Sequence, residues 1–394
     1  MRLAKHRELI TTCAGAMFCH LVVSMSGPLI PLQAIGLGAS PSILGLLISI
    51  SAVGAVCAAV PSGYFIRSYG TRLPLTVSSV AMAGSCLFLY LFPSLPNMFL
   101  GLTAFQLFRT IFAVSIQSHV GGLRSTGDIS ANFGWYGVAT AIGGMIGPTM
   151  SGIIIDHVGL DLPWLIMAAL SAFTALMLPF LISSGQQSQK SVPDPDHPKA
   201  RIRDLINITT IVGILSSFVI IFALGSRRIF YPIFLKDLGF SASVIGAMMS
   251  VRAFVTLFSR MSAGPAVRRF GSRMAILNVC LFVLALGIGT TSLCRTLALI
   301  VINSVVMGLG LGMAMPLSQA TVFESAPTDQ KGIAMGVRMT GNRLAQMSSP
   351  LLFGIVTQVF GISTAFWVAG LILFLVSVPV FLWWRGTEGK SSKI

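Results

Sequence analysis

Seven arginines lie inside long apolar stretches of this chain, and they are the residues most able to carry chemistry. They are Arg109, Arg227, Arg228, Arg252, Arg260, Arg338 and Arg343. If these stretches cross a membrane, each guanidinium costs at least about 2.5–3.5 kcal/mol unless it meets water, a carbonyl group or an anion. Arginine also presents a planar fork that matches carboxylate and phosphate groups. The pattern therefore predicts a hydrated, electropositive cavity that favours an anionic ligand.

The acidic residues are distributed differently. All eleven lie between the apolar stretches or at their ends: Glu8, Asp128, Asp156, Asp161, Asp194, Asp196, Asp204, Asp237, Glu324, Asp329 and Glu388. No Asp, Glu or Lys lies deep in an apolar stretch, so few carboxylates are placed to pair with the arginines there. This asymmetry strengthens the prediction of an anionic ligand.

The spacing of the polar residues selects the binding candidates. Arg338, Asn342 and Gln346 follow at intervals of four, which places them on one face of a helix. Arg227 and Arg228 are adjacent and point about 100° apart, so we expect only one of the two to face a cavity. The substrate-binding candidates are Arg109, Arg228, Arg252, Arg338, Asn342 and Arg343. Alternatively, some arginines reach the membrane surface or cap helix ends, and Arg260 is placed for such a role.

His20 is the candidate for proton coupling. It is the one histidine near the centre of an apolar stretch, and the charge of histidine changes near neutral pH. The alternatives are that His20 is structural, that the proton travels on the substrate, or that Asp128, Glu324 or Asp329 handles it near the ends of the stretches.

The composition explains what must position these groups. The chain has 394 residues, of which 54% are hydrophobic and 9% charged, and its mean hydropathy is +0.86. A membrane-spanning helix needs about 20 apolar residues. Twelve stretches qualify, at roughly 9–32, 43–66, 73–93, 97–120, 134–155, 163–184, 206–233, 243–265, 274–293, 297–320, 333–357 and 363–384. The sequence predicts an all-α membrane protein with twelve transmembrane helices, the first of them too long for a cleaved signal.

The basic residues outside the stretches predict the orientation. Seventeen lie in segments on one side: Arg2, Lys5, Arg7, Arg67, Arg72, Arg124, Lys190, Lys199, Arg201, Arg203, Arg268, Arg269, Arg273, Lys331, Arg385, Lys390 and Lys393. Only Lys236 and Arg295 lie on the other. Because basic residues favour the cytoplasmic side, we expect cytoplasmic termini and a cytoplasmic segment 185–205. The net charge of +15 does not indicate nucleic-acid binding, because most of the basic residues lie in these short segments between apolar stretches.

The chain also contains an internal repeat. Residues 31–73 match residues 232–274 at an offset of 201, which pairs Gly38 with Gly239 and Ser40 with Ser241. A second block, at an offset of 202, pairs Pro148 with Pro350. The first block includes two basic segments that we expect to be gating loops, with Gly63, Arg67, Gly70 and Arg72 in one and Gly264, Arg268, Gly271 and Arg273 in the other. We therefore expect two six-helix halves, 1–184 and 206–394, joined by the polar, proline-containing linker 185–205.

These features resemble the major facilitator superfamily, over nearly the whole chain. The basic segments resemble that family's G-x3-D-x2-G-x-R loops, with Arg67 where the family usually has Asp. Gly143, Gly147, Pro148 and Gly152 resemble the antiporter motif of drug:proton antiporters, with Ser151 in place of one glycine. Arg109 resembles the arginine of another motif of that group, without its Gln-Gly half. Gly137 and Gly144 add to the small residues with which the same stretch would pack closely.

The resemblance and the arginines together predict a secondary transporter that works by alternating access. We expect proton-linked export of a small organic anion or amphipathic metabolite, of siderophore-like or drug-like character. One alternative is proton-linked uptake of an organic anion or sugar phosphate, and another is a membrane sensor or scaffold that transports nothing. We expect a monomer in the bacterial inner membrane, whose partners are the substrate, protons and lipid.

The sequence shows no sign of an enzyme. No HExxH, GxSxG or phosphate-binding loop is present. The six cysteines form no CxxC pair, and no His/Cys spacing suits a metal. We therefore expect no catalytic residues, no cofactor and no metal.

Overall fold

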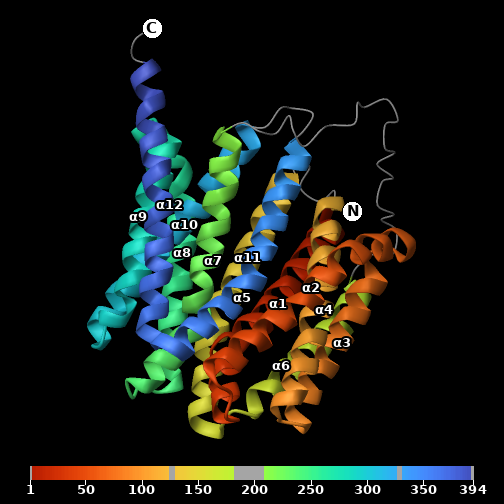
Figure 1. The fold of residues 1–394 in the computed structure, drawn as a ribbon. Coiled ribbons are helices and arrows are strands. Elements are labelled where there is room, and N and C mark those ends of the chain that lie inside the picture. Colours follow the sequence, from red (N-terminus) through yellow and green to blue (C-terminus); the bar gives the residue numbers. More distant parts are fainter. Residues whose placement is uncertain (1, 124–128, 182–207, 326–330, 392–394) are drawn as a thin grey trace. The chain divides into compact units, whose positions relative to one another are not determined.

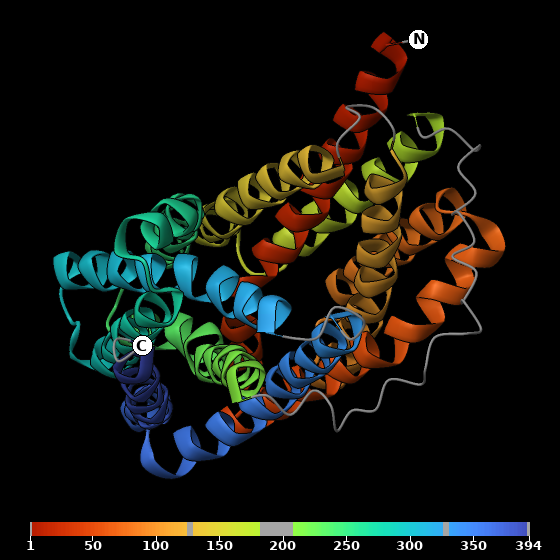
Figure 2. The ribbon, with the colours of Figure 1, turned by 90° about the horizontal axis from the view of Figure 1, so that it is seen from above.

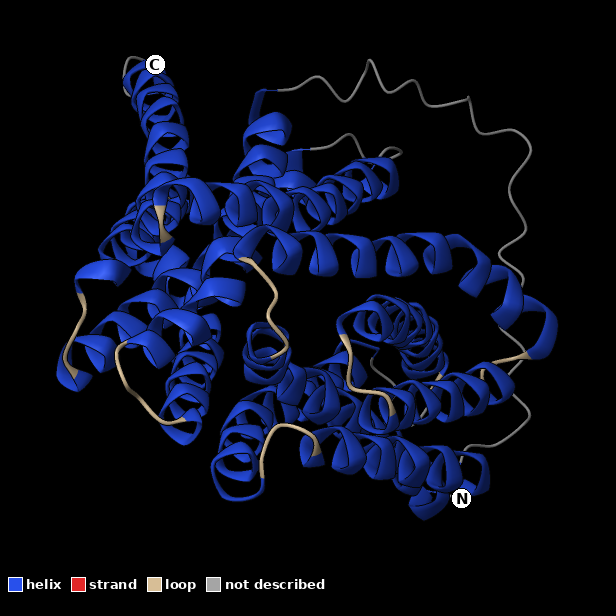
Figure 3. Cartoon of the chain, turned by 60° about the horizontal axis from the view of Figure 1, so that its bottom comes forward, coloured by secondary structure: helices blue, strands red, loops and turns tan. Residues whose placement is uncertain are grey.

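The computed structural model describes residues 2–123, 129–181, 208–325 and 331–391. Within these ranges the chain forms helices and no strand (Figure 3). The α-helices are α1 (Arg2–Gly36), α2 (Pro41–Tyr69), α3 (Arg72–Leu91), α4 (Leu95–Gly122), α5 (Ile129–Val158), α6 (Leu162–Leu181), α7 (Ile208–Asp237), α8 (Ala242–Phe270), α9 (Arg273–Gly289), α10 (Leu297–Ser325), α11 (Lys331–Phe360) and α12 (Ile362–Ser391). The predicted all-α class is confirmed. The expected linker 185–205, Asp128 and Asp329 lie outside the described residues.

Most of the helices are long and apolar enough to span a membrane. Ten helices in the described part meet this condition, and α6 contributes a shorter apolar stretch, Leu162–Leu178. The remaining helix is α11, which includes Arg338, Asn342 and Arg343. The chain is a multi-pass membrane protein, and the sequence marks α11, which does not meet this condition, as a binding element.

The two basic segments are mostly helical, which corrects the expectation that they are loops. Despite the internal prolines Pro61 and Pro265, α2 and α8 remain helical up to the residue before Gly70 and Gly271. The chain turns only at those two glycines, whose φ angles are +72° and +75°. Six of the eight predicted gating residues therefore lie on helices: Gly63, Arg67, Arg72, Gly264, Arg268 and Arg273.

The internal repeat reappears in the backbone. In the described part, every glycine with a positive φ belongs to a matched pair: Gly38 and Gly239, Gly70 and Gly271, Gly159 and Gly361. The paired serines also act alike, because the Ser40 and Ser241 hydroxyls accept bonds from the backbone N–H groups three residues later. The two copies of the repeat therefore build the same turns.

The described chain packs as two compact units. Unit 1 contains the described residues of Met1–Val192 and Leu235–Ser250, and unit 2 contains those of Pro193–Phe234 and Val251–Ile394. In unit 1, α1 packs on α5 and α6, while α3 packs on α4 and α6 (Figure 1). In unit 2, α9 packs on α10 and α12 (Figure 2), and Phe222 of α7 meets Phe353 of α11 at 5.5 Å between ring centroids.

Candidate functional site

The adjacent arginines of α7 have different surroundings. Arg227 is only 4% exposed. Its guanidinium donates to Asn303 Oδ1 at 2.6 Å and to Ser304 Oγ at 3.3 Å, both on α10. Its guanidinium carbon also lies 4.2 Å from the Tyr231 ring centroid. Arg228 is exposed. Arg227 is thus held as a clamp between helices, and Arg228, the predicted binding residue, is not.

Asn303 completes this clamp, and sequence reasoning missed it. Its Nδ2 donates to the Gly287 carbonyl of α9 at 2.7 Å, while its Oδ1 accepts from Arg227. One carboxamide therefore joins α7, α9 and α10. The sequence could have indicated this role, because Asn303 lies inside an otherwise apolar stretch and a buried amide needs partners for both its donor and its acceptor.

Arg252 on α8 lies near the same cluster. It is half-buried, and the charges of Arg227 and Arg228 both act on it. Three like charges repel one another, more strongly inside a protein than in water. An anion bound beside Arg228 and Arg252 would relieve that repulsion.

Arg338 on α11 has an incomplete set of partners. It is 5% exposed, and one guanidinium nitrogen donates to Ser318 Oγ of α10 at 3.3 Å. Its Nε has no hydrogen-bond partner, nor has the buried Oδ1 of Asn342 one turn further along. Among the described residues no carboxylate pairs with Arg338. Because a buried cation without a counter-ion is costly, this position suits an anionic ligand. Arg343 is half-buried on the same helix.

Arg109 and His20 lie near each other in unit 1. Arg109 on α4 is half-buried and acts electrostatically on His20 of α1 and on Tyr136 of α5. His20 is also half-buried. The structure therefore brings together the arginine of the family motif and the proton-coupling candidate.

The antiporter-like glycines of α5 allow close approach of two helices. A Cβ at Gly143 would overlap the Met17 carbonyl oxygen of α1, and a Cβ at Gly147 would overlap Ser24 Oγ. A Cβ at Gly152 would overlap the Ala242 carbonyl oxygen at the start of α8. The predicted packing role is wrong for Gly137 and Gly144, because no atom lies within 4 Å of a Cβ at either. They lie on a different side of α5 from the glycines that meet α1.

Asp156 strengthens the contact between α5 and the start of α8, all of it within unit 1. Its two carboxylate oxygens accept from the backbone N–H groups of Ala242 at 2.8 Å and Ser243 at 2.7 Å. This caps the N-terminus of α8, where the helix dipole favours negative charge. Thr149 Oγ1 donates to Ser250 Oγ at 2.7 Å further along. The sequence shows the acid, but its partner could not be predicted, because Ala242 is 86 residues away along the chain.

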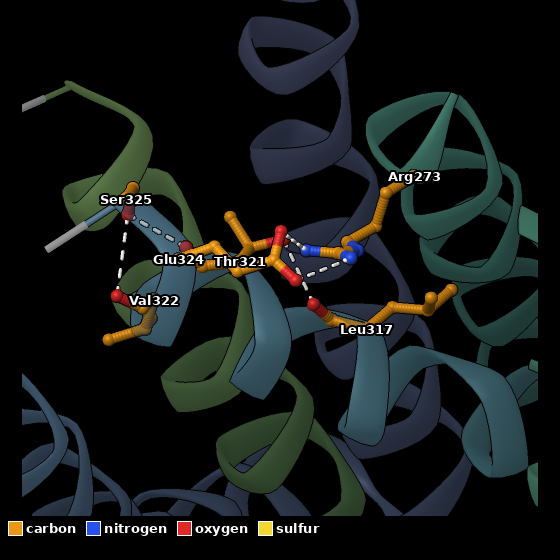
Figure 4. A network of polar contacts seen from close by, with 6 residues as sticks. All are labelled: Arg273, Leu317, Thr321, Val322, Glu324 and Ser325. Carbon is orange, nitrogen blue, oxygen red and sulfur yellow. Dashed lines mark hydrogen bonds and ion pairs between the residues drawn. The ribbon is translucent and has the colours of Figure 1, made fainter. Parts of the chain in front are cut away.

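The basic segment of the second repeat copy is anchored by an ion pair. Arg273, the first residue of α9, pairs with Glu324 in the last turn of α10, with Nη2 donating to Oε1 at 2.8 Å (Figure 4). The Ser325 hydroxyl donates to the Thr321 carbonyl at 2.7 Å in the same turn. Arg67 and Arg268 are exposed. Of the predicted gating residues, Arg273 therefore has a defined partner that holds the turn after α8.

The turn glycines support a direct prediction. Gly70→Val and Gly271→Val place a β-branched side chain at a positive φ, which only glycine adopts without strain. We expect transport to fall more than the amount of folded protein in the membrane, because the strain acts on the turn and not on the packed core. Gly84→Val on α3 is the control, since no atom lies within 4 Å of its Cβ position. Parallel losses of surface expression and transport would restrict these turns to a role in assembly.

Comparison with known proteins identifies the family. The model of the Major Facilitator Superfamily matches residues 12–228 and 213–394. The tetracycline resistance protein, class D, of Salmonella ordonez is 25% identical over 349 residues, 86% of each chain. The multidrug resistance protein MdtG of Salmonella arizonae is 22% identical over 384 residues, 93% of each chain.

A solved structure has the same fold. The crystal structure of the nucleoside transporter NupG superposes with a TM-score of 0.80 at 14% identity, covering 94% of this chain and 99% of that one. The family model spans both sequence halves, and its members are membrane transporters and not enzymes. The chain therefore belongs to the Major Facilitator Superfamily.

Proposed function

We propose that this protein exports a small organic anion or amphipathic metabolite, siderophore-like or drug-like, in exchange for protons. One observation carries the anionic part of the proposal: Arg338 is buried, its Nε has no partner, and no described carboxylate pairs with it. A ligand carboxylate or phosphate would supply the missing acceptor. Each charge-assisted hydrogen bond of this kind contributes about 1.5–3 kcal/mol.

The other arginines support the same charge preference. Arg228 is exposed beside Arg252, and Arg252 experiences repulsion from the arginines of α7. In this proposal the substrate-binding residues are Arg109, Arg228, Arg252, Arg338, Asn342 and Arg343. His20, near Arg109, is the proposed proton carrier.

The direction of transport is supported by two facts. The names of the relatives from Salmonella describe resistance to tetracycline and to multiple drugs. The glycine motif of α5 resembles that of drug:proton antiporters, and its glycines lie where close helix contact requires them. In this account 1–184 and 206–394 are the moving halves, 185–205 links them, and a monomer is sufficient.

Flux through the purified protein in liposomes tests the proposal. Labelled citrate and glucose 6-phosphate serve as anions, glucose as a neutral compound and choline as a cation, with protein-free liposomes as the control. We expect an imposed pH gradient to drive an anion against the flow of protons, and a protonophore to abolish the flux. Movement of the anion together with protons would indicate uptake instead. Transport restricted to choline or glucose would contradict the anionic part.

The charge bias of seventeen basic residues against two gives a topology prediction. We propose that the protein lies in a bacterial inner membrane with both termini in the cytoplasm. A reporter that is active only in the cytoplasm, fused after Ile394, should be active. The same reporter inserted between α9 and α10, next to Arg295, should be inactive. The opposite pattern would overturn the orientation.

A further inference from the structure

Two phenylalanines of α7 lie beside the helix that contains Arg338. Phe218 and Phe222 are half-buried, and their rings stack with 5.9 Å between the centroids and an interplanar angle of 13°. Phe222 also contacts the fully buried ring of Phe353 on α11. A Cβ at Gly341 of α11 would lie 3.8 Å from Cδ2 of Phe218. Phe218 therefore ends a row of three rings next to α11, and part of its own ring is left uncovered by the described protein.

The packing of three helices of unit 2 places Phe218 level with Arg338. One apolar cluster contains a residue from each helix: Ile214 of α7, Val322 of α10 and Ala334 of α11. On one side of this cluster, Thr210 Oγ1 of α7 lies 2.8 Å from Ser325 Oγ of α10, so these two helices run in opposite directions. On the other side, four residues from the cluster on each helix, lie Phe218, Ser318 and Arg338. The bond from Arg338 to Ser318 belongs to this layer.

The ring of Phe218 and the guanidinium of Arg338 lie toward the same side of α11. Gly341, the residue nearest to the Phe218 ring on this helix, follows Arg338 by three residues, which is about 60° round the helix axis. Arg338 is 5% exposed, and its Nε has no hydrogen-bond partner. A buried cationic donor that lacks an acceptor thus occurs next to an aromatic ring that is only partly covered.

We infer that the anion bound by Arg338 is an aromatic carboxylate, whose ring packs against Phe218 while its carboxylate accepts from the guanidinium. This inference rests on the anionic substrate proposed above and names its chemical class. A ligand ring extends the row of phenylalanines, and an aromatic pair adds about two- to tenfold in affinity beyond what burial of its area provides. A small polyanion such as citrate has no apolar face with which to cover these rings.

Binding of three related compounds to the purified wild-type protein tests the inference. Benzoate is the aromatic acid, cyclohexanecarboxylate has the same charge and a saturated ring, and benzamide has the aromatic ring without the charge. Isothermal titration calorimetry in detergent measures each Kd. We expect benzoate to bind at least about threefold more tightly than cyclohexanecarboxylate, because only benzoate has a π-system. We expect it to bind at least about tenfold more tightly than benzamide, because only benzoate supplies a charged acceptor.

Variants at position 218 assign the aromatic preference to this ring. Phe218→Leu should bind the two acids with affinities within about twofold of each other, whereas Phe218→Tyr, which retains a ring, should keep the preference for benzoate. Phe282→Leu is the matched control, because Phe282 of α9 is also half-buried and also pairs with one neighbouring ring, that of Phe374. This control should retain the wild-type preference. Arg338→Ala should weaken binding of both acids alike.

The outcomes separate this inference from the proposed function. Equal affinity of the wild type for the two acids, or an unchanged preference in Phe218→Leu, would overturn the aromatic assignment and leave the anionic substrate in place. Binding of citrate or glucose 6-phosphate without any binding of benzoate at millimolar concentration would overturn it in the same way. Benzamide bound as tightly as benzoate would instead contradict the anionic substrate itself.

Discussion

Arg338→Ala should weaken binding of an anionic substrate at least about tenfold, equivalent to about 1.4 kcal/mol, while the protein still reaches the membrane. The reason is the surroundings of this side chain in the described structure. Its guanidinium donates to the Ser318 hydroxyl at 3.3 Å, and its Nε has no partner. Removing the guanidinium therefore disrupts little protein structure, and it removes a donor available to a ligand. Thermal shift and flux with an anion from the panel measure the two effects.

Further variants test this mechanism against a general loss of charge. Arg252→Ala should behave like Arg338→Ala, and lysine at either position should restore only part of the affinity, since it keeps the charge and loses the planar fork. Arg295→Ala is the matched control, because this exposed arginine lies between α9 and α10. Equal transport of neutral or cationic compounds by wild type and both alanine variants would contradict the anionic substrate.

Gly143→Val should destabilise the protein by about 3 kcal/mol or more and remove most of it from the membrane. A Cβ at this position would overlap the Met17 carbonyl oxygen and would lie 2.9 Å from the Leu21 nitrogen. Both atoms belong to the backbone of α1, so the added side chain must push the two helices apart. Close packing of this type supplies much of the free energy of association between membrane helices. Lipid tails are as apolar as the side chains, so there is no hydrophobic driving force to hold the helices together. Thermal unfolding in detergent measures the loss.

The neighbouring glycine provides the control. Gly144→Val adds the same atoms one residue later, where no atom lies within 4 Å of the Cβ position. We expect it to change stability by less than about 1 kcal/mol, the ordinary effect of a β-branched residue in a helix. If the two variants unfold at the same temperature, the contact between α1 and α5 is not what these glycines provide.

The helices could be predicted from the sequence because their apolar stretches are long and the repeat marks their turns. Their ends could not, because the charged residues that follow an apolar stretch also continue a helix. Thus α2 includes Arg67, and the chain turns only at Gly70. From the sequence alone, Gly143 and Gly144 are equally good candidates for close helix packing, because both lack a side chain. Only the position of α1 separates them, since a helix that is apolar all round does not reveal which side meets a neighbour.

The candidate site shows the same limit. Adjacency predicted that Arg227 and Arg228 would differ, and the burial of Arg227 agrees with that reasoning. Its role as a clamp depends on Asn303, 76 residues away. Contacts of this kind come from the packing of whole helices, which one sequence does not specify.

The most direct test of the central claim is the charge preference of ligand binding to the wild-type protein. Pairs of compounds that differ in charge alone, such as glucose 6-phosphate and glucose, or a carboxylate and its amide, are compared by thermal shift. A ligand that binds only the folded state stabilises it by RT ln(1 + [L]/Kd), about 2.7 kcal/mol at a hundred times Kd. The account predicts that the anionic member of at least one pair raises the unfolding temperature at concentrations where its neutral partner does not. Stabilisation by neutral or cationic members alone would contradict it.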